Sequence, residues 1–213
     1  MNQITLEVRG TSLKTTNALL ARQVLEQETG LVPILGELIT RDNYLIPPAI
    51  GQHWHGQGGT YVGVIRGEDG NPDYHLVAPV HAQIASITYG GHGKRTDGAN
   101  YRRDGMANTK ALLASGTEHP AALWASEQES EGHRDLYLPA QAEAFLCWAN
   151  IPEQFNDKGW WITSTQGGPT SAWIQYFVDG SQHGDYKVTA RPAFAVRRIL
   201  IPSTLNALES PRA

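Results

Sequence analysis

The stretch WWITSTQGGPTSAWIQYFVDG, residues 160–180, places three tryptophans, a tyrosine and a phenylalanine among serine, threonine, glutamine and glycine. It is more polar than an ordinary core strand and more aromatic than an ordinary loop. In an extended strand successive side chains point to opposite faces, and one of the two faces must lie against a core. The two sets along residues 172–180 are Trp173, Gln175 and Phe177 on one side, and Ile174, Tyr176 and Val178 on the other.

This composition is compatible with a binding surface and with a structural strand. Tryptophan and tyrosine provide large, stiff contact areas with one hydrogen-bonding atom each, and small polar residues add adaptable contacts, as in sugar and protein recognition. Alternatively, the aromatic residues pack between a sheet and helices. We expect Trp161, Trp173 and Phe177 to be mainly structural. The residues that we predict to contact a ligand are Gln166, Thr170, Ser171, Gln175, Tyr176, Gln182, His183, Asp185 and Tyr186.

Residues 1–50 precede the main domain and differ from it in pattern. ITLEV alternates like a short strand, and TTNALLARQVLEQETG has the capping residues of a helix that ends before Gly30. The apolar run that follows is broken by three prolines. Because these apolar pieces are short, we predict an attachment or oligomerisation segment over residues 1–50. The alternative is that this segment is one edge of the main domain. Residues 203–213 are expected to form a C-terminal tail.

Residues 51–202 predict an α+β domain with short antiparallel strands at its two ends and two to three short helices between them. TYVGVIRGEDGNPDYHLVAPV, residues 60–80, is typical of a β-hairpin. AFAVRRILIP, residues 193–202, predicts one closing strand.

The helices of this domain are indicated by proline and glycine at their ends. They are expected over residues 106–116, from Pro120 onward, and over residues 138–151. The apolar face of the last helix is expected to consist of Ala142, Phe145, Leu146 and Ala149.

Composition and charge narrow the classes of function. The 213 residues carry a formal net charge of −4 and contain one cysteine, Cys147, which excludes an internal disulfide. Cys147 lies in the apolar run AFLCWANI, so we expect a small buried side chain. Without a basic block, nucleic-acid binding has little electrostatic support. The chain shows neither a signal-peptide pattern nor an apolar run long enough for membrane insertion.

The sequence contains no motif that predicts a catalytic or metal site. A Ser164–His183–Asp185 triad lacks the turn that would expose the serine. A glycan-cleaving enzyme would need two carboxylates that face each other across a cleft. The candidates, none of which is distinguished by its spacing, are Glu143, Glu153, Asp157, Asp179 and Asp185. Histidines that could gather around zinc lack acidic or cysteine partners at suitable spacing; they are His53, His55, His81 and His92.

Three segments together resemble the Lcl C-terminal domain family: LYLPAQAEAFLCW, the opening stretch, and RPAFAVRRI. The shared pattern is Leu-Pro before a helix, a Trp-Trp-Ile-Thr-Ser-Thr strand, an Ala-Trp strand that ends near a glycine, and a closing strand with Val-Arg-Arg. The likeness is close over about residues 133–201 and looser over residues 58–132. The matching positions are Leu138, Pro139, 160–165, Ala172, Trp173, Phe177, Gly180 and 196–198.

This resemblance implies a C-type-lectin-like fold and a module that displays a ligand-binding surface. Family members occur in bacterial adhesins and in bacteriophage tail proteins. We therefore expect a non-enzymatic phage or prophage tail or baseplate protein, located in the virion and made in the bacterial cytoplasm, that recognises a bacterial surface receptor such as a glycan, a pilus or a protein. The alternatives are a structural connector of the virion and a glycan-cleaving enzyme.

Expected partners are other tail or baseplate proteins and further copies of the chain, a trimer among the options, because multivalent display raises weak affinity. The Glu-Pro-Asn and Trp-Asn-Asp motifs of calcium-dependent lectins are absent from the sequence. We accordingly expect neither a cofactor nor a metal ion.

Overall fold

The computed structural model describes residues 4–8, 11–15, 46–68, 70–155 and 159–201. The chain divides into two compact units, residues 1–46 and 47–213. In the first unit, β1 (Ile4–Val8) and β2 (Thr11–Thr15) form an antiparallel hairpin, and β1 confirms the strand predicted from ITLEV. The helix predicted after it and the tail at 203–213 lie outside the described residues.

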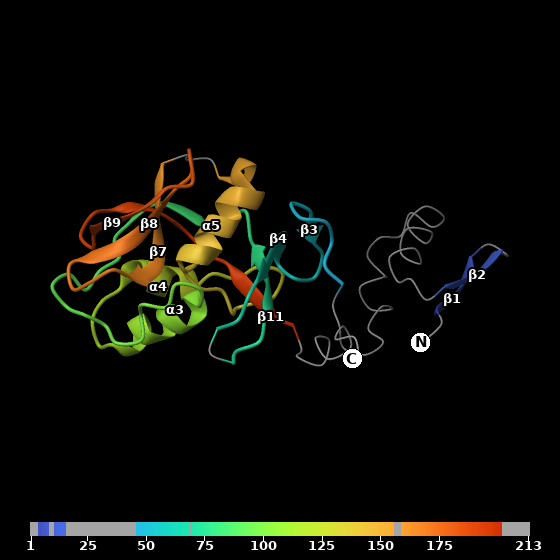
Figure 1. Cartoon of the computed structure of the whole chain (residues 1–213), viewed down its shortest axis with the longest axis horizontal. Coiled ribbons are helices and arrows are strands. Elements are labelled where there is room, and N and C mark those ends of the chain that lie inside the picture. Colours follow the sequence, from blue (N-terminus) through green and yellow to red (C-terminus); the bar gives the residue numbers. More distant parts are fainter. Residues whose placement is uncertain (1–3, 9–10, 16–45, 69, 156–158, 202–213) are drawn as a thin grey trace, which may run out of the picture. The chain divides into compact units, whose positions relative to one another are not determined.

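The second unit contains a four-stranded antiparallel sheet in the order β11-β5-β4-β3 (Figure 1). Its strands are β3 (His53–Trp54), β4 (Gly59–Ile65), β5 (Tyr74–Ala78) and β11 (Arg197–Leu200). The β4–β5 pair confirms the predicted hairpin.

A second, three-stranded antiparallel sheet has the order β7-β8-β9. It consists of β7 (Trp160–Gln166), β8 (Ser171–Tyr176) and β9 (Gln182–Tyr186). The opening stretch of the sequence is therefore a β-hairpin with its turn at Gly167–Thr170.

The prediction of one closing strand over residues 193–202 is wrong, because the chain changes sheets there. β10 (Arg191–Phe194) pairs with β6 (Gln83–Ile87), whereas β11 pairs with β5. Between them, Val196 forms an isolated bridge with Tyr137.

In the part of this unit that the structure describes, three α-helices and one 3₁₀ turn connect the strands, and the unit is α+β as predicted. They are α3 (Gly105–Ala114), α4 (Pro120–Ser126), α5 (Gln141–Asn150) and η1 (Pro152–Gln154). The carboxylate of Asp104 caps α3 by accepting a hydrogen bond from the Ala107 amide, at 2.8 Å. Pro120 is the first residue of α4, where a missing N–H does no harm. α5 contacts both larger sheets, through β4, β7 and β8 (Figure 1).

The apolar face predicted for α5 is wrong in part, since of its four residues Leu146 packs against the core, whereas Phe145 and Ala149 do not. Its buried residues are Gln141, Glu143, Ala144 and Cys147. Phe145 is 45% exposed, and Ala149 is exposed as well. Glu143 lies on the buried side and bonds the N-terminal amides of two helices, as described below.

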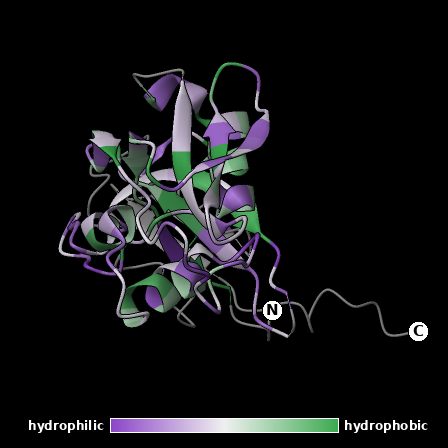
Figure 2. Ribbon diagram, turned by 90° about the vertical axis from the view of Figure 1, so that its left-hand side faces the viewer, coloured by the Kyte–Doolittle hydropathy of each residue, from purple (hydrophilic) through white to green (hydrophobic). Residues whose placement is uncertain are grey.

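The core of the second unit consists of two clusters of buried side chains. One gathers aromatic rings between the sheets, including Phe155, Trp161, Phe177 and Phe194. The other is built mainly of alanines and leucines around α3 and α4. Figure 2 shows hydrophobic residues, in green, on the central strands, and hydrophilic residues, in purple, prominent on outer loops. Cys147 is fully buried in the first cluster, as expected.

Candidate functional site

One face of the β8–β9 pair presents flat rings around an open position. Ser171 pairs with Tyr186 and Trp173 pairs with Gly184, so these four residues share one face of the sheet. Tyr186 is 66% exposed and Trp173 is half-buried. A Cβ atom at Gly184 would meet no atom within 4 Å, so the surface is open at this point. We call Ser171, Trp173, Gly184, Tyr186 and the adjoining Arg102 the aromatic platform.

Arg102 forms the border of the aromatic platform on the side of the loop before α3. Its guanidinium carbon lies 5.9 Å from the centroid of the Trp173 ring, within the range of a cation–π contact. The side chain is exposed and forms no ion pair with any described residue. Its backbone carbonyl accepts a hydrogen bond from the amide of Ala142 in α5, at 2.9 Å. The arginine is thus held by its backbone while its charged end stays in solvent.

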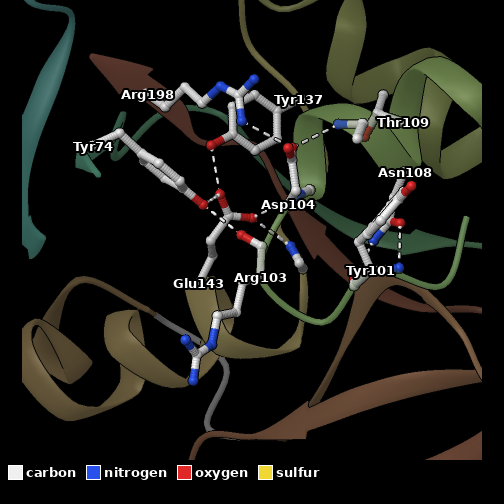
Figure 3. Close-up of polar contacts among 12 residues, drawn as sticks. Tyr74, Tyr101, Arg103, Asp104, Asn108, Thr109, Tyr137, Glu143 and Arg198 are labelled. Atoms are coloured by element: carbon white, nitrogen blue, oxygen red, sulfur yellow. Dashed lines mark hydrogen bonds and ion pairs between the residues drawn. The ribbon is translucent and has the colours of Figure 1, made fainter. Parts of the chain in front are cut away.

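The loop that carries Arg102 is attached to β7 by buried polar groups. Gln166 accepts a hydrogen bond from the Thr96 amide at its Oε1 and donates one to the Thr96 carbonyl from its Nε2. Asn108 of α3 bonds both the amide and the carbonyl of Tyr101, at 2.9 and 2.7 Å (Figure 3). These paired bonds fix residues 96–101 along the end of the strand.

A buried lysine completes this attachment. Lys187 follows β9, is fully buried, and donates hydrogen bonds from Nζ to the Lys94 carbonyl and to Gln166 Oε1, at 2.8 and 2.7 Å. The ammonium group also lies 5.3 Å from the centroid of the Tyr89 ring. It forms no ion pair with a carboxylate of the described residues. Burial lowers the pKa of Lys187 to about 8.

Two of the residues predicted to contact a ligand are inside the protein. Gln166 is 4% exposed and is engaged with Thr96 and Lys187. Gln175 is fully buried, and its Nε2 donates to the carbonyls of Tyr176 and Ser181. Their polar character serves internal hydrogen bonding, so we remove both from the predicted contact surface.

Gln182 is half-buried on the platform face, below the N-terminus of α5. Its Nε2 donates to Gln175 Oε1 and to the Gln141 carbonyl, both at 2.8 Å. Thr170 is exposed in the turn between β7 and β8. Of the nine predicted contact residues, the structure places Ser171 and Tyr186 on the aromatic platform and Thr170 beside it.

The remaining predicted contact residues, Tyr176, His183 and Asp185, lie on the opposite face of the sheet. Tyr176 stacks on Trp160 with ring centroids 4.5 Å apart, and His183 approaches Trp160 edge-on at 5.3 Å. Asp185 forms an ion pair with Arg191 at 2.9 Å. The predicted residues therefore form two separate surfaces. Of the three residues expected to be structural, Trp161 and Phe177 are in the core.

A buried carboxyl group joins the N-terminal ends of α3 and α5 (Figure 3). Glu143 is fully buried, and its Oε2 lies 3.1 Å from the Gly105 amide and 2.6 Å from the Ala140 amide. Its Oε1 lies 2.7 Å from the Tyr74 hydroxyl and 2.6 Å from the Tyr137 hydroxyl. Burial raises the pKa of Glu143 to about 7, although these hydrogen bonds favour the charged form.

An apolar groove of about 600 Å³ lies beside α5. It is lined by Trp148, Ala149, Pro152, Phe177 and Val178. Val178 is 60% exposed. This groove offers a surface of a different kind from the aromatic platform, without charged side chains in its lining.

Within the described residues, no group of three or more histidine, cysteine, aspartate or glutamate side chains is arranged to hold a metal ion. Among the described helices, none is long and apolar enough to cross a bilayer. A scan against models of protein families found no match, and a search of curated proteins found no relative.

The roles of three residues were not predicted from the sequence, although Glu143 had been considered as a candidate carboxylate for glycan cleavage. Arg102 stood in a loop with no pattern that indicates its aromatic neighbour. Nothing in the sequence indicated that Lys187 is buried, because a lysine after a strand is usually exposed. Glu143 had one usable signal: a glutamate three residues after the N-cap residue Ala140 can bond back to the cap amide.

Proposed function

We propose that this chain is a non-enzymatic receptor-binding module of a bacteriophage or prophage tail or baseplate, which binds a bacterial surface receptor through the aromatic platform. The observation that carries the proposal is the Trp173–Gly184 pair, in which a flat indole stands beside an open glycine position on an exposed strand pair. Such surfaces bind sugar rings and protein side chains with little loss of conformational freedom.

The support for a non-enzymatic role comes from the carboxylates considered for glycan cleavage. Glu143 is fully buried and engaged with two amides and two phenols. Asp185 is paired with Arg191. Asp157 lies outside the described residues. Incubation with envelope polysaccharide, followed by chromatography of the products, should release no fragments; released fragments would favour the hydrolase alternative.

A cell-binding assay tests the proposal. The fluorescently labelled chain is incubated with a panel of bacterial strains, and the bound fraction is measured for wild type and for Gly184→Gln. Because a side chain at Gly184 meets open space, the variant should fold normally while its side chain covers the platform. We expect at least a tenfold loss of cell binding with an unchanged melting temperature.

Two further variants make this assay specific. Tyr186→Ala removes an exposed ring of the aromatic platform and should also weaken binding. Leu123→Ala removes a comparably exposed apolar side chain from α4, 50% exposed, and should leave binding unchanged. Equal binding by all four proteins to a strain that wild type binds would remove the platform from the proposal.

The finer features of the proposal concern fold family, assembly and location. We propose that the second unit has a C-type-lectin-like arrangement, that the chain assembles as a homo-oligomer such as a trimer, and that it resides in the virion tail. The resemblance of its 136–148, 160–180 and 191–199 segments to the Lcl C-terminal domain family supports these features. Light scattering of the purified chain and immunogold labelling of particles test assembly and location.

The apolar groove favours a second candidate, a structural connector that docks on another tail or baseplate protein. Exposed Val178 lines the groove, and the exposed ring of Phe145 lies 5.2 Å from that of Trp148 in the same lining. Neighbouring exposed apolar side chains are typical of protein contacts. Substituting Val178→Asp should abolish incorporation into particles if the connector function holds, and should leave cell binding by the free chain intact.

A further inference from the structure

Several oxygen atoms lie unusually close together around the buried carboxyl group of Glu143. Three short oxygen–oxygen contacts meet in this buried cluster (Figure 3). The Tyr74 hydroxyl lies 2.5 Å from the Arg103 carbonyl and 2.7 Å from Glu143 Oε1, and the Tyr137 hydroxyl lies 2.6 Å from the same Oε1. Oxygen atoms this close need a proton between them, because two bare lone pairs repel each other.

Counting the protons identifies the state of Glu143. Each phenol supplies one proton, and the Arg103 carbonyl supplies none. If Tyr74 donates to the carbonyl and Tyr137 donates to Oε1, the contact between Tyr74 and Oε1 still needs a proton. Only the carboxyl group can supply it. Burial raises the pKa of Glu143 to about 7, which agrees with a protonated carboxyl group below neutral pH.

We propose that Glu143 carries a proton in the folded protein, and that release of this proton above neutral pH shifts the segment at Arg102–Arg103 and thereby alters the aromatic platform. The regulatory part of this inference rests on the proposed function. The proton itself goes to solvent, and no bond other than the carboxyl O–H is broken.

Few residues separate the carboxyl group of Glu143 from the aromatic platform. After ionisation, the Tyr74 proton is drawn to the carboxylate, and the phenol oxygen and the Arg103 carbonyl are left 2.5 Å apart without a proton between them. The repulsion is relieved when the backbone at Arg103 moves. The preceding residue, Arg102, bonds the Ala142 amide through its carbonyl and lies over Trp173. A shift at Arg103 therefore changes the border of the platform directly.

The phenols and the thiol beside Glu143 stay neutral over the same pH range. Burial raises the pKa values of Tyr74, Tyr137 and Cys147, so these groups stay neutral near pH 7. Asp104 and Arg198 form an ion pair at 2.9 Å. Within the described cluster, Glu143 is the group that changes charge near neutrality. The titratable and charged groups that face it are Tyr74 from β5, Asp104 before α3, Tyr137 before α5, Cys147 in α5 and Arg198 from β11.

Nuclear magnetic resonance of the full chain tests both parts without a ligand. The side-chain carboxyl carbon of Glu143 and the indole N–H of Trp173 are followed from about pH 5 to about pH 9. We expect both signals to shift with one midpoint near 7, instead of the ordinary glutamate value of 4.5. A Glu143 midpoint below 5, or a Trp173 signal that does not follow Glu143, would overturn the inference.

Matched variants exclude indirect effects. Glu143→Gln keeps a neutral group at the same place and should abolish the pH-dependent Trp173 shift. Glu153→Gln, which changes an exposed carboxylate in η1, should retain it. Tyr74→Phe removes the short contact to Arg103 but leaves Glu143 able to titrate, so the Trp173 shift should disappear there too; its persistence would contradict the route.

Cell binding separates this inference from the proposed function. Wild type should bind at least threefold differently at pH 6 and pH 8, and Glu143→Gln should bind equally at both. Coupled resonance shifts in a chain that binds no bacterial strain would sink the proposed function while leaving the proton switch established. Equal wild-type binding at both pH values would overturn the regulatory role.

Discussion

Gly180 lies against the indole of Trp148, so closely that a Cβ atom there would stand 2.5 Å from a ring carbon. Gly180 also has a φ of +81°, a backbone conformation that residues other than glycine rarely adopt. Two independent constraints therefore require glycine in the turn between β8 and β9. They explain why the opening stretch of the sequence ends in Asp-Gly.

Substituting Gly180→Ala should lower the free energy of unfolding by about 3 kcal/mol, the sum of left-handed strain and overpacking. Urea unfolding followed by tryptophan fluorescence measures this change. Gly51→Ala is the matched control, because Gly51 has a φ of +83° and nothing within 4 Å of its Cβ position. It should lose only about 1 kcal/mol. Equal losses of stability in the two variants would show that the Trp148 ring moves aside for the added methyl group at little cost in free energy.

Lys187 predicts an unusual response to alkaline pH. Its pKa is lowered to about 8 in the folded protein from 10.5. Above pH 8 the unfolded chain therefore holds more protons than the folded chain, and stability rises with pH until 10.5. The free energy of unfolding should increase between about pH 8 and about pH 9.5, below the range in which tyrosine ionises.

The variant Lys187→Met isolates this effect, because its unbranched side chain fills a similar volume without titrating. It should lose about 2 kcal/mol at pH 7, since the Lys94 carbonyl loses its donor and Gln166 Oε1 keeps only the Thr96 amide. Its stability should no longer rise across the alkaline interval. A variant with the same alkaline slope as wild type would assign that slope to other groups.

The surroundings of His119 predict that the folded protein loses stability in acid. Burial, with a smaller contribution from nearby Lys187, lowers the pKa of His119 from 6.5. Its Nδ1 lies 3.2 Å from the Tyr89 carbonyl, so the neutral ring donates there. Because the unfolded state takes up a proton first, stability is lost as pH falls below 6.5.

Urea titrations at pH 7 and pH 5 measure the loss. His119→Gln should be less stable than wild type at pH 7 and should lose less stability on acidification. The effect will be partial, because burial also lowers the pKa of His75, which remains in the variant. An unchanged pH 7 to pH 5 difference in His119→Gln would assign the acid response to His75 or other groups.

Asn108 predicts a link between the core and the aromatic platform. Its side chain is fully buried and bonds the amide and carbonyl of Tyr101, the residue before Arg102. Asn108→Ala should lower the free energy of unfolding by about 3 kcal/mol, since the Tyr101 backbone loses its partners. Hydrogen exchange at residues 100–103 should accelerate at the same time. Asn100→Ala, at an exposed position of the same loop, should change neither quantity.

Local patterns predicted the elements of the second unit but not their arrangement. The hairpin at residues 60–80 and the helix after Pro120 follow from turn residues and caps, which act within a few positions. The prediction of one closing strand failed because the amides of Ala195 and Val196 bond the backbones of Ala82 and Tyr137. These bonds lead the chain from one sheet to another. Such partners are distant in sequence and leave no local trace.

The candidate site was predicted in part for a similar reason. Alternation along β8 identified which side chains share a face, but not which parts of each face are covered. α5 and the loop before α3 cover Gln175 and Gln166, whereas Tyr186 remains open. Glu143 lies on the buried side of α5 against the apolar pattern, because four hydrogen-bonding partners compensate the burial of its carboxyl group.

The burial of Cys147 has a practical consequence for following this protein at work. The chain contains no other thiol, and burial raises the pKa of this one well above its usual value. Maleimide dyes react with accessible thiolates, so the native chain should not react with them. A cysteine introduced at exposed Val188, two residues beyond Tyr186, would give a uniquely addressable reporter beside the platform.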